Sequence, residues 1–165
     1  MKIKQSPLKV IDFLVINSRL KFTSPSEEVN IKELFSNYSI DIDFAKVIQD
    51  DNYQIFMKIS VNEDTTPKQV GYSIFAEAVG IFSLVKEGLS KEEIENYSNY
   101  TSLIITINHL RNFISNLTSY GPFNKYVLPS IDMRDLITQK RLSIIKNPQT
   151  KKRPQVIKKD MAKNN

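Results

Sequence analysis

The sequence predicts an α+β fold in which a four-stranded antiparallel sheet carries a long helix and a second, shorter helix packed on one face. Apolar and polar residues alternate with the period of a β-strand in four stretches between residues 8 and 85. After these stretches, apolar residues recur at helical spacing. Strands that precede helices, rather than alternating with them, favour helices gathered on one face of an antiparallel sheet.

The four strands are predicted over residues 8–22, 38–44, 53–63 and 69–85. We expect both faces of the first strand to be partly covered, because apolar residues occupy both its odd-numbered and its even-numbered positions. The even-numbered ones are Leu8, Val10, Leu14, Ile16, Leu20 and Phe22. A polar turn at residues 49–52 joins the second and third strands into a hairpin. Gly71 and Gly80 are expected to mark bends or bulges in the fourth strand. Four such strands in succession favour a meander.

The long helix is predicted to begin with a capping box, because Ser90 is followed three residues later by Glu93. We expect an irregular start at residues 96–100. The helix should end before Gly121, which suits a left-handed cap, and Pro122, which cannot continue the hydrogen-bond ladder.

Asp132 is expected to cap the second helix, which covers residues 133–145 and buries Met133, Leu136 and Ile137. The residues that follow are charged and include no aromatic side chain, so they cannot offset the entropy of ordering. The sequence therefore predicts one domain over residues 1–145 and a basic, disordered tail over residues 146–165.

The net charge of +5 belongs to this tail. Residues 146–165 carry seven of the 23 lysines and arginines but one of the 18 acidic residues, which leaves 16 basic and 17 acidic residues elsewhere. The body is thus close to neutral. Nucleic-acid binding is expected only through the tail, for which we favour a solubilising role.

Few residues suit catalysis or metal binding. Cysteine is absent, and His109 is the only histidine and lies within the helical pattern. The acidic pairs Asp41/Asp43 and Asp50/Asp51 fit a solvated strand face and a turn better than metal ligands. The four glycines form no phosphate-binding motif. We expect no catalytic residue, metal or cofactor and therefore no enzyme, although carboxylate-only hydrolysis is compatible with the composition.

Neither a signal peptide nor an apolar stretch approaching the roughly 20 residues that cross a bilayer is recognisable. The lack of cysteine gives no sign of an oxidising compartment. We therefore expect a soluble, cytoplasmic protein without membrane insertion.

Several short segments of the sequence follow one another in a characteristic order. They are GIFSL at residues 80–84, a long helix with Arg111 and Ile114 that ends at Gly121, YVLPSIDMRDL at residues 126–136 and, less specifically, LKFTSP at residues 20–25. Together they resemble the bacterial protein-export chaperone SecB and its relatives over most of residues 8–137. The resemblance implies a four-stranded sheet crossed by the long helix, with protomers paired into dimers and often tetramers.

The resemblance also implies two sets of site residues. Family members bind extended, unfolded polypeptide in apolar grooves, and the matching residues are Tyr72, Phe82, Phe123, Tyr126, Leu128 and Met133. Alternate residues of the fourth strand lie at the family's protomer interface, and here these are Ile74, Ala76 and Ala78. Burial in an ordinary core is the alternative interpretation of both sets.

One difference concerns the acidic surface on which the family docks the translocation motor SecA. The matching positions hold Arg19, Lys21, Thr23 and Phe75, so this surface is not carried over and delivery to SecA is in doubt. Two hypotheses follow. The first is an ATP-independent chaperone, a holdase for unfolded polypeptides or preproteins. The second is an interaction module dedicated to one partner, for example an antitoxin.

Overall fold

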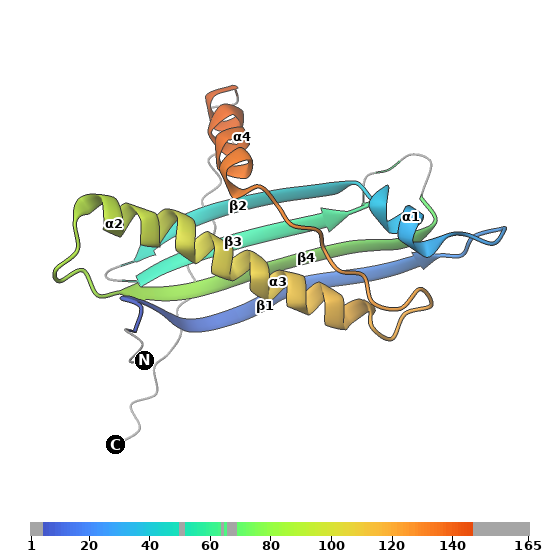
Figure 1. Ribbon diagram of the computed structural model, residues 1–165, viewed down its shortest axis with the longest axis horizontal. Helices are drawn as coiled ribbons and strands as arrows, with labels where there is room; N and C mark the ends of the chain where they lie inside the picture. The colour runs from blue at the N-terminus through green and yellow to red at the C-terminus, as the bar shows by residue number, and fades with distance from the viewer. Residues whose placement is uncertain (1–4, 50–51, 64, 66–68, 147–165) are drawn as a thin grey trace, which may run out of the picture.

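The computed structural model describes residues 5–49, 52–63, 65 and 69–146 (Figure 1). The expected tail, apart from Lys146, and the acidic pair of the 49–52 turn lie outside the described residues. Among the described residues, no helix has the length and apolar content needed to cross a membrane.

Four antiparallel strands form one sheet, and their bounds are β1 (Leu8–Thr23), β2 (Ile40–Gln49), β3 (Asn52–Val61) and β4 (Gly71–Leu84). The predicted bounds agree within two residues except for β2, which runs five residues further. The order in the sheet is β1-β4-β3-β2. The predicted meander is therefore wrong for β1, which pairs with β4 and gives the sheet a Greek-key arrangement. The connection from β1 to β2 contains a short helix that we did not predict, α1 (Ile31–Ser36).

Two β-bulges in β1 decide which of its residues face the helices. The register against β4 shifts at Ile11 and again at Ile16, and each extra residue reverses the alternation of side chains. Leu14 therefore lies opposite Val79, on the sheet face that α3 does not cover, while Phe13 lies opposite Gly80 on the helix side. The prediction that Leu14 shares a face with the strand's other even-numbered apolar residues is wrong. Apolar contacts on both faces of β1 are confirmed.

The predicted roles of the two glycines in β4 have different outcomes. Gly71 begins the strand with a φ of +94°, so the expected bend is confirmed. Gly80 continues the strand in register opposite Ile55, so the expected bulge is wrong there. A Cβ at Gly80 would lie 2.6 Å from Oγ1 of Thr106, which explains the glycine as a point of close approach between helix and strand.

A nearly continuous helical layer crosses one face of the sheet (Figure 1). It consists of α2 (Lys91–Asn96), a π-helical turn η1 (Tyr97–Thr101) and α3 (Ser102–Thr118). The capping box is confirmed, because Ser90 Oγ accepts from Glu93 N at 3.2 Å and Glu93 Oε2 accepts from Ser90 N at 2.8 Å. The π-helical turn confirms the expected irregular start.

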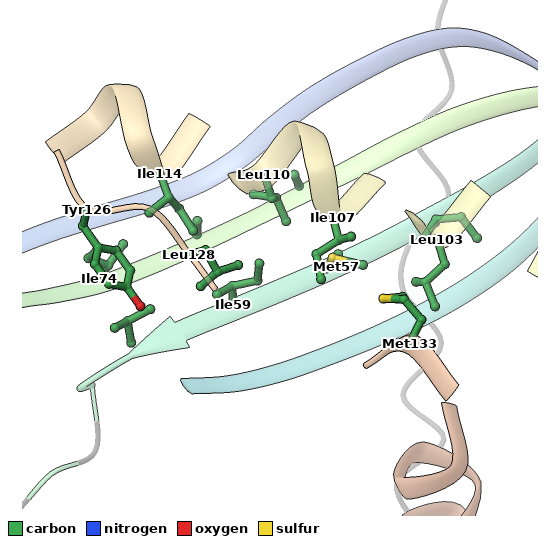
Figure 2. Packing of buried hydrophobic residues seen from close by; sticks show 14 of the residues in the cluster. Met57, Ile59, Ile74, Leu103, Ile107, Leu110, Ile114, Tyr126, Leu128 and Met133 are labelled. Atoms are coloured by element: carbon green, nitrogen blue, oxygen red, sulfur yellow. The ribbon is translucent and has the colours of Figure 1, made fainter. Parts of the chain in front are cut away.

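The main core fills the space between α3 and the sheet (Figure 2). Its members alternate along β3 and β4 and recur every three or four residues along α3. Those with less than 2% exposure include Met57, Ile59, Ile74, Leu103, Leu110 and Ile114. A smaller cluster on the opposite face joins Phe56, Val79 and Ile81 with Leu14 and Val47.

The last helix, α4 (Met133–Lys146), projects beyond β2 rather than lying along the sheet (Figure 1). Its cap is confirmed, since Asp132 Oδ1 accepts from the backbone N–H groups of Arg134 at 2.9 Å and Asp135 at 3.2 Å. Met133 is buried and the predicted pair Leu136 and Ile137 is half-buried. The first half of α4 thus attaches to the body of the domain.

Candidate functional site

The segment that joins α3 to α4, residues 119–132, is called the crossing loop here. It turns back from the end of α3 and runs over the sheet toward β2 (Figure 1). Tyr72 of β4 holds its start, because its hydroxyl donates to Asn124 O at 2.9 Å and accepts from Phe123 N at 2.9 Å. The loop is therefore anchored to the sheet by side-chain hydrogen bonds.

Gly121 makes this anchor possible. A Cβ on Gly121 would lie 2.4 Å from the hydroxyl oxygen of Tyr72, so no larger residue fits there without movement. The left-handed conformation predicted for Gly121 is wrong, because the crossing loop takes a positive φ at Asn124 instead, with a value of 58°. The glycine serves close approach rather than helix capping.

Further contacts hold the loop along α3. Thr118 Oγ1 donates to Ile114 O at 2.9 Å and accepts from Tyr126 N at 2.9 Å. Arg111, which the family resemblance singled out, donates from its guanidinium to Pro129 O at 2.6 Å. The middle and the later part of the crossing loop are thus tied to α3.

Aromatic rings fill the space beneath the start of the loop. This aromatic cluster joins β1, α1, β4 and the crossing loop, with ring centroids between 5.0 and 6.2 Å apart; its members are Phe22, Phe35, Tyr38, Tyr72, Phe123 and Tyr126. Such ring pairs contribute roughly 0.5–1.5 kcal/mol each beyond the area that they bury. The cluster gives the loop a well-packed base.

Burial raises the pKa of Tyr126 to about 12, and the nearby Tyr38 hydroxyl adds to the shift. The Tyr126 hydroxyl is fully buried and has no hydrogen-bond partner among the residues that the structure describes. The pKa of Tyr38 and that of Tyr72 are also raised by burial. All three phenols are therefore neutral at physiological pH.

The predicted groove residues lie mainly on the inner side of this arrangement. Five of the six are no more than 8% exposed and belong to the core of the single chain, namely Tyr72, Phe82, Tyr126, Leu128 and Met133. The sixth, Phe123, is partly exposed and packs edge-on against Phe22 at 5.0 Å. Their contact with a bound polypeptide stays a prediction.

Exposed apolar side chains lie next to the buried ones. Three residues of this kind surround Phe123 along the chain or in space: Phe22 is 36%, Val127 54% and Tyr120 99% exposed. Phe123 and these three residues together are called the loop surface. Sequence reasoning did not select Tyr120 or Val127, although Val127 alternates with the buried Tyr126 and Leu128 in an extended segment, a pattern that indicates an outward side chain.

The predicted interface residues Ile74, Ala76 and Ala78 are fully buried. Ala78 and Ala76 form, with Gly80, a strip of small residues on the side of β4 that α3 covers. All three residues pack within the core of the single chain. Contact with a second protomer at these positions stays a prediction.

The outer edge of β1 exposes a separate apolar row. Val10, Ile11, Val15 and Ile16 are between 37% and 47% exposed, and β1 is an edge strand of the sheet. Two of the four are the extra residues of the bulges.

The sheet face opposite α3 holds Arg19 and Phe75, two positions for which the resemblance implies acidic residues. Phe75 lies between two cations, with Arg19 at 5.4 Å and Lys58 at 5.5 Å from its ring centre. Arg19 also forms an ion pair with Glu63. At these positions the face presents a cation-flanked aromatic ring, and Asp43 and Glu77 lie opposite Lys58 in the register.

The residues that the sequence analysis considered for catalysis or metal binding make contacts typical of structural roles. His109 is exposed and stacks on Phe13 with ring centres 4.8 Å apart. Asp41 and Asp43 are exposed, as expected for a solvated strand face, and Asp43 pairs with Lys140. In the part of the chain that the structure describes, no three acidic or histidine side chains gather as a metal site would require.

Neither a protein-family model nor a curated protein sequence matches this chain. Among solved structures, the fold is similar to the SecB-like chaperone Rv1957 of Mycobacterium tuberculosis, determined in complex with a ChAD peptide from the Rv1956 HigA1 antitoxin. The TM-score is 0.51 and the identity 12%, over 76% of this chain and 91% of that one. A protein of unknown function from Streptococcus agalactiae has a TM-score of 0.39 and 11% identity, over 75% of this chain and 97% of that one. With its four-stranded antiparallel sheet and crossing helix, this chain shares the fold of a SecB-like chaperone.

Proposed function

We propose that this protein is an ATP-independent chaperone that binds unfolded polypeptide and keeps it from aggregating. The observation that carries the proposal is the loop surface, where Tyr120 and Val127 expose apolar groups on a loop that Tyr72 and Thr118 hold in place. Exposed apolar groups on a preorganised segment bind flexible ligands at a lower entropic cost than a mobile segment would. The SecB-like fold supports the same function.

The sheet edges add a second, sequence-independent mode of contact. β1 and β2 are the two outer strands of the described sheet. An extended client can form backbone hydrogen bonds with such an edge whatever its side chains are. Apolar contact at the loop and backbone pairing at an edge together suit a chaperone with many clients.

Light scattering from a chemically unfolded client, with and without the protein, tests the proposal. We expect stoichiometric protein to suppress aggregation in the absence of nucleotide. The double variant Tyr120→Ser/Val127→Ser should suppress less. The matched control is Val85→Ser, at a site that is 47% exposed and lies at the end of β4, far along the strand from Tyr72. Unchanged client aggregation with the unmodified protein would reject the holdase.

A chaperone dedicated to one partner is the second candidate. The cation-flanked Phe75 favours it, because the positions for which the resemblance implies SecA-docking carboxylates hold Arg19 and Phe75 instead. The Rv1957 structure, which contains an antitoxin peptide, offers a precedent for a single small partner. Affinity capture from the native cell distinguishes the two: one dominant partner supports a dedicated chaperone, and a broad set of precursors supports a general one.

We also propose that protomers associate along β1. Its row of exposed apolar residues, which includes Ile11 and Ile16, would be covered by a second copy, and β2 would then be the edge left open to an extended client. Lysine on an edge strand opposes such pairing. Ile11→Lys/Ile16→Lys should therefore lower the molar mass measured by chromatography with light scattering, whereas an unchanged mass would place the association elsewhere.

A further inference from the structure

A cavity of about 410 Å³ lies between the π-helical turn η1 and α4. Asn96 and Tyr100 line one side of the cavity, and the other side comes from α4, through Arg134, Ile137, Thr138 and Arg141. Both arginines are exposed at its rim. The cavity thus combines apolar groups with two cationic ones.

The spacing along α4 explains this combination. Arg134 and Arg141 are seven residues apart, with Ile137 three and four residues from them, so the three side chains share one side of the helix. Ile144 and Ile145, which are 53% and 74% exposed, continue the same side beyond Arg141. We call these five residues the arginine face.

The two guanidinium groups lack carboxylate partners among the described residues. Other charged groups of α4 are already engaged: Lys140 pairs with Asp43 of β2, and Asp135 accepts from the side chain of Gln139 at 3.4 Å. Charge on the arginine face is therefore available to a ligand. Leu136, which packs against the core, and Lys140 lie on an adjacent side of the same helix.

A partly buried connection keeps η1 in position against the sheet. Lys46 of β2 donates from Nζ to Ser98 Oγ at 3.0 Å and to Asn99 Oδ1 at 2.7 Å, and it lies 4.9 Å from the ring centre of Tyr53. The cavity wall next to Tyr100 is thus held by side chains from two strands. Interruptions of the π type are often found at functional sites.

We propose that the arginine face binds acidic segments of client polypeptides that also carry apolar residues. The proposal rests on the chaperone function above and names the class of client. Guanidinium groups bind carboxylates through paired hydrogen bonds, and exposed isoleucines take up neighbouring apolar side chains. The isoleucines favour a polypeptide over a nucleic acid, because phosphates give them nothing to contact.

The test uses the full chain and three fluorescent peptides that share the same leucines and phenylalanines. Their polar positions hold glutamate in the first peptide, glutamine in the second and lysine in the third. The variant is Arg134→Gln/Arg141→Gln, which keeps helix propensity. The charge-matched control is Lys32→Gln/Lys91→Gln on exposed positions of α1 and α2.

Fluorescence anisotropy should show the tightest binding for the glutamate peptide, with a preference that weakens between about 0.1 M and about 1 M salt. The Arg134→Gln/Arg141→Gln variant should bind the glutamate peptide about tenfold more weakly, as expected for two partly exposed ion pairs. Its affinity for the glutamine peptide should be unchanged, and the control should behave like the unmodified protein.

Three results would overturn the inference. Equal affinity for the glutamate and glutamine peptides, with both bound, rejects the acidic preference and leaves the chaperone function standing. Failure to bind any of the peptides rejects both. Tighter binding of a single-stranded oligonucleotide, lost in the Arg134→Gln/Arg141→Gln variant, assigns the arginine face to phosphates instead.

Discussion

The hydroxyl of Tyr72 donates a hydrogen bond to the backbone carbonyl of Asn124 at 2.9 Å, and this contact ties strand β4 to the crossing loop. The same oxygen accepts from Phe123 N at 2.9 Å. One side chain therefore satisfies two backbone groups of a loop that has no regular secondary structure. The stability of the loop surface depends on this contact.

Tyr72→Phe should lower the free energy of unfolding by about 1–3 kcal/mol, because a backbone donor and a backbone acceptor lose their partner. Urea denaturation measures this change. The control is Tyr53→Phe on β3, where the hydroxyl makes no hydrogen bond within the described chain; we expect a loss below about 0.5 kcal/mol. Equal losses in the two variants would contradict the anchoring role.

Tyr126→Phe, unlike Tyr72→Phe, should not lower the free energy of unfolding. The Tyr126 hydroxyl is buried without a partner in the described part of the chain, so its removal relieves a desolvation cost and should leave the free energy of unfolding unchanged or slightly higher at neutral pH. A clear loss of stability in the urea transition would show that the hydroxyl has a partner in solution.

The raised phenol pKa values predict a fall in stability at alkaline pH. The folded pKa of Tyr126 is about 12, and the unfolded value is about 10. The folded state therefore holds this proton more tightly, and the resulting stability is complete below pH 10 and is lost as the pH rises from about 10 through about 12. Tyr126→Phe should make that fall in stability shallower, and the fall that remains should come from Tyr38 and Tyr72. Denaturation across this pH range checks the prediction, and identical slopes would contradict it.

Gly80→Ala should destabilise the domain by about 1–3 kcal/mol, because the added Cβ would lie 2.6 Å from Thr106 Oγ1 and 2.7 Å from the ring of Phe82. A double-mutant cycle with Thr106→Ala separates the two contacts. We expect the combined loss to be smaller than the sum of the single losses, since removing the hydroxyl relieves part of the overlap. Strict additivity would place the strain elsewhere.

The bulges of β1 can be tested by comparing Leu14→Ala with Ile16→Ala. Leu14 packs against Phe56, Val79 and Ile81, whereas Ile16 is 47% exposed. We expect a loss of about 1–2 kcal/mol for Leu14→Ala and less than about 0.5 kcal/mol for Ile16→Ala. A strand without bulges would put the two residues on the same face and give similar losses.

Much of the secondary structure could be predicted because its signals are local. Ser90 with Glu93 and Asp132 with its following backbone N–H groups form the expected caps, and the π-helical turn η1 falls where the apolar spacing was irregular. Alternation located β3 and β4 within two residues. These features depend on residues that are close together in the chain.

The candidate site was predicted less completely. The resemblance directed attention to Phe123 and Tyr126 in the correct loop, but five of the six groove residues are core residues in the single chain. Exposure depends on what packs above a side chain, which apolar character alone does not reveal. The arginine face was missed because its two charges are seven residues apart and become one surface only on a helix.

The sequence by itself determined the α+β class, the order of the elements and the caps of the helices. Only the tertiary structure decided that β1 pairs with β4 and contains two bulges, that Gly80 and Gly121 serve close approach, and that α4 projects from the sheet. The physical reason is the range of the interactions. Hydrogen-bond caps and apolar periodicity act over a few residues, whereas strand pairing, register and packing depend on residues far apart in the chain.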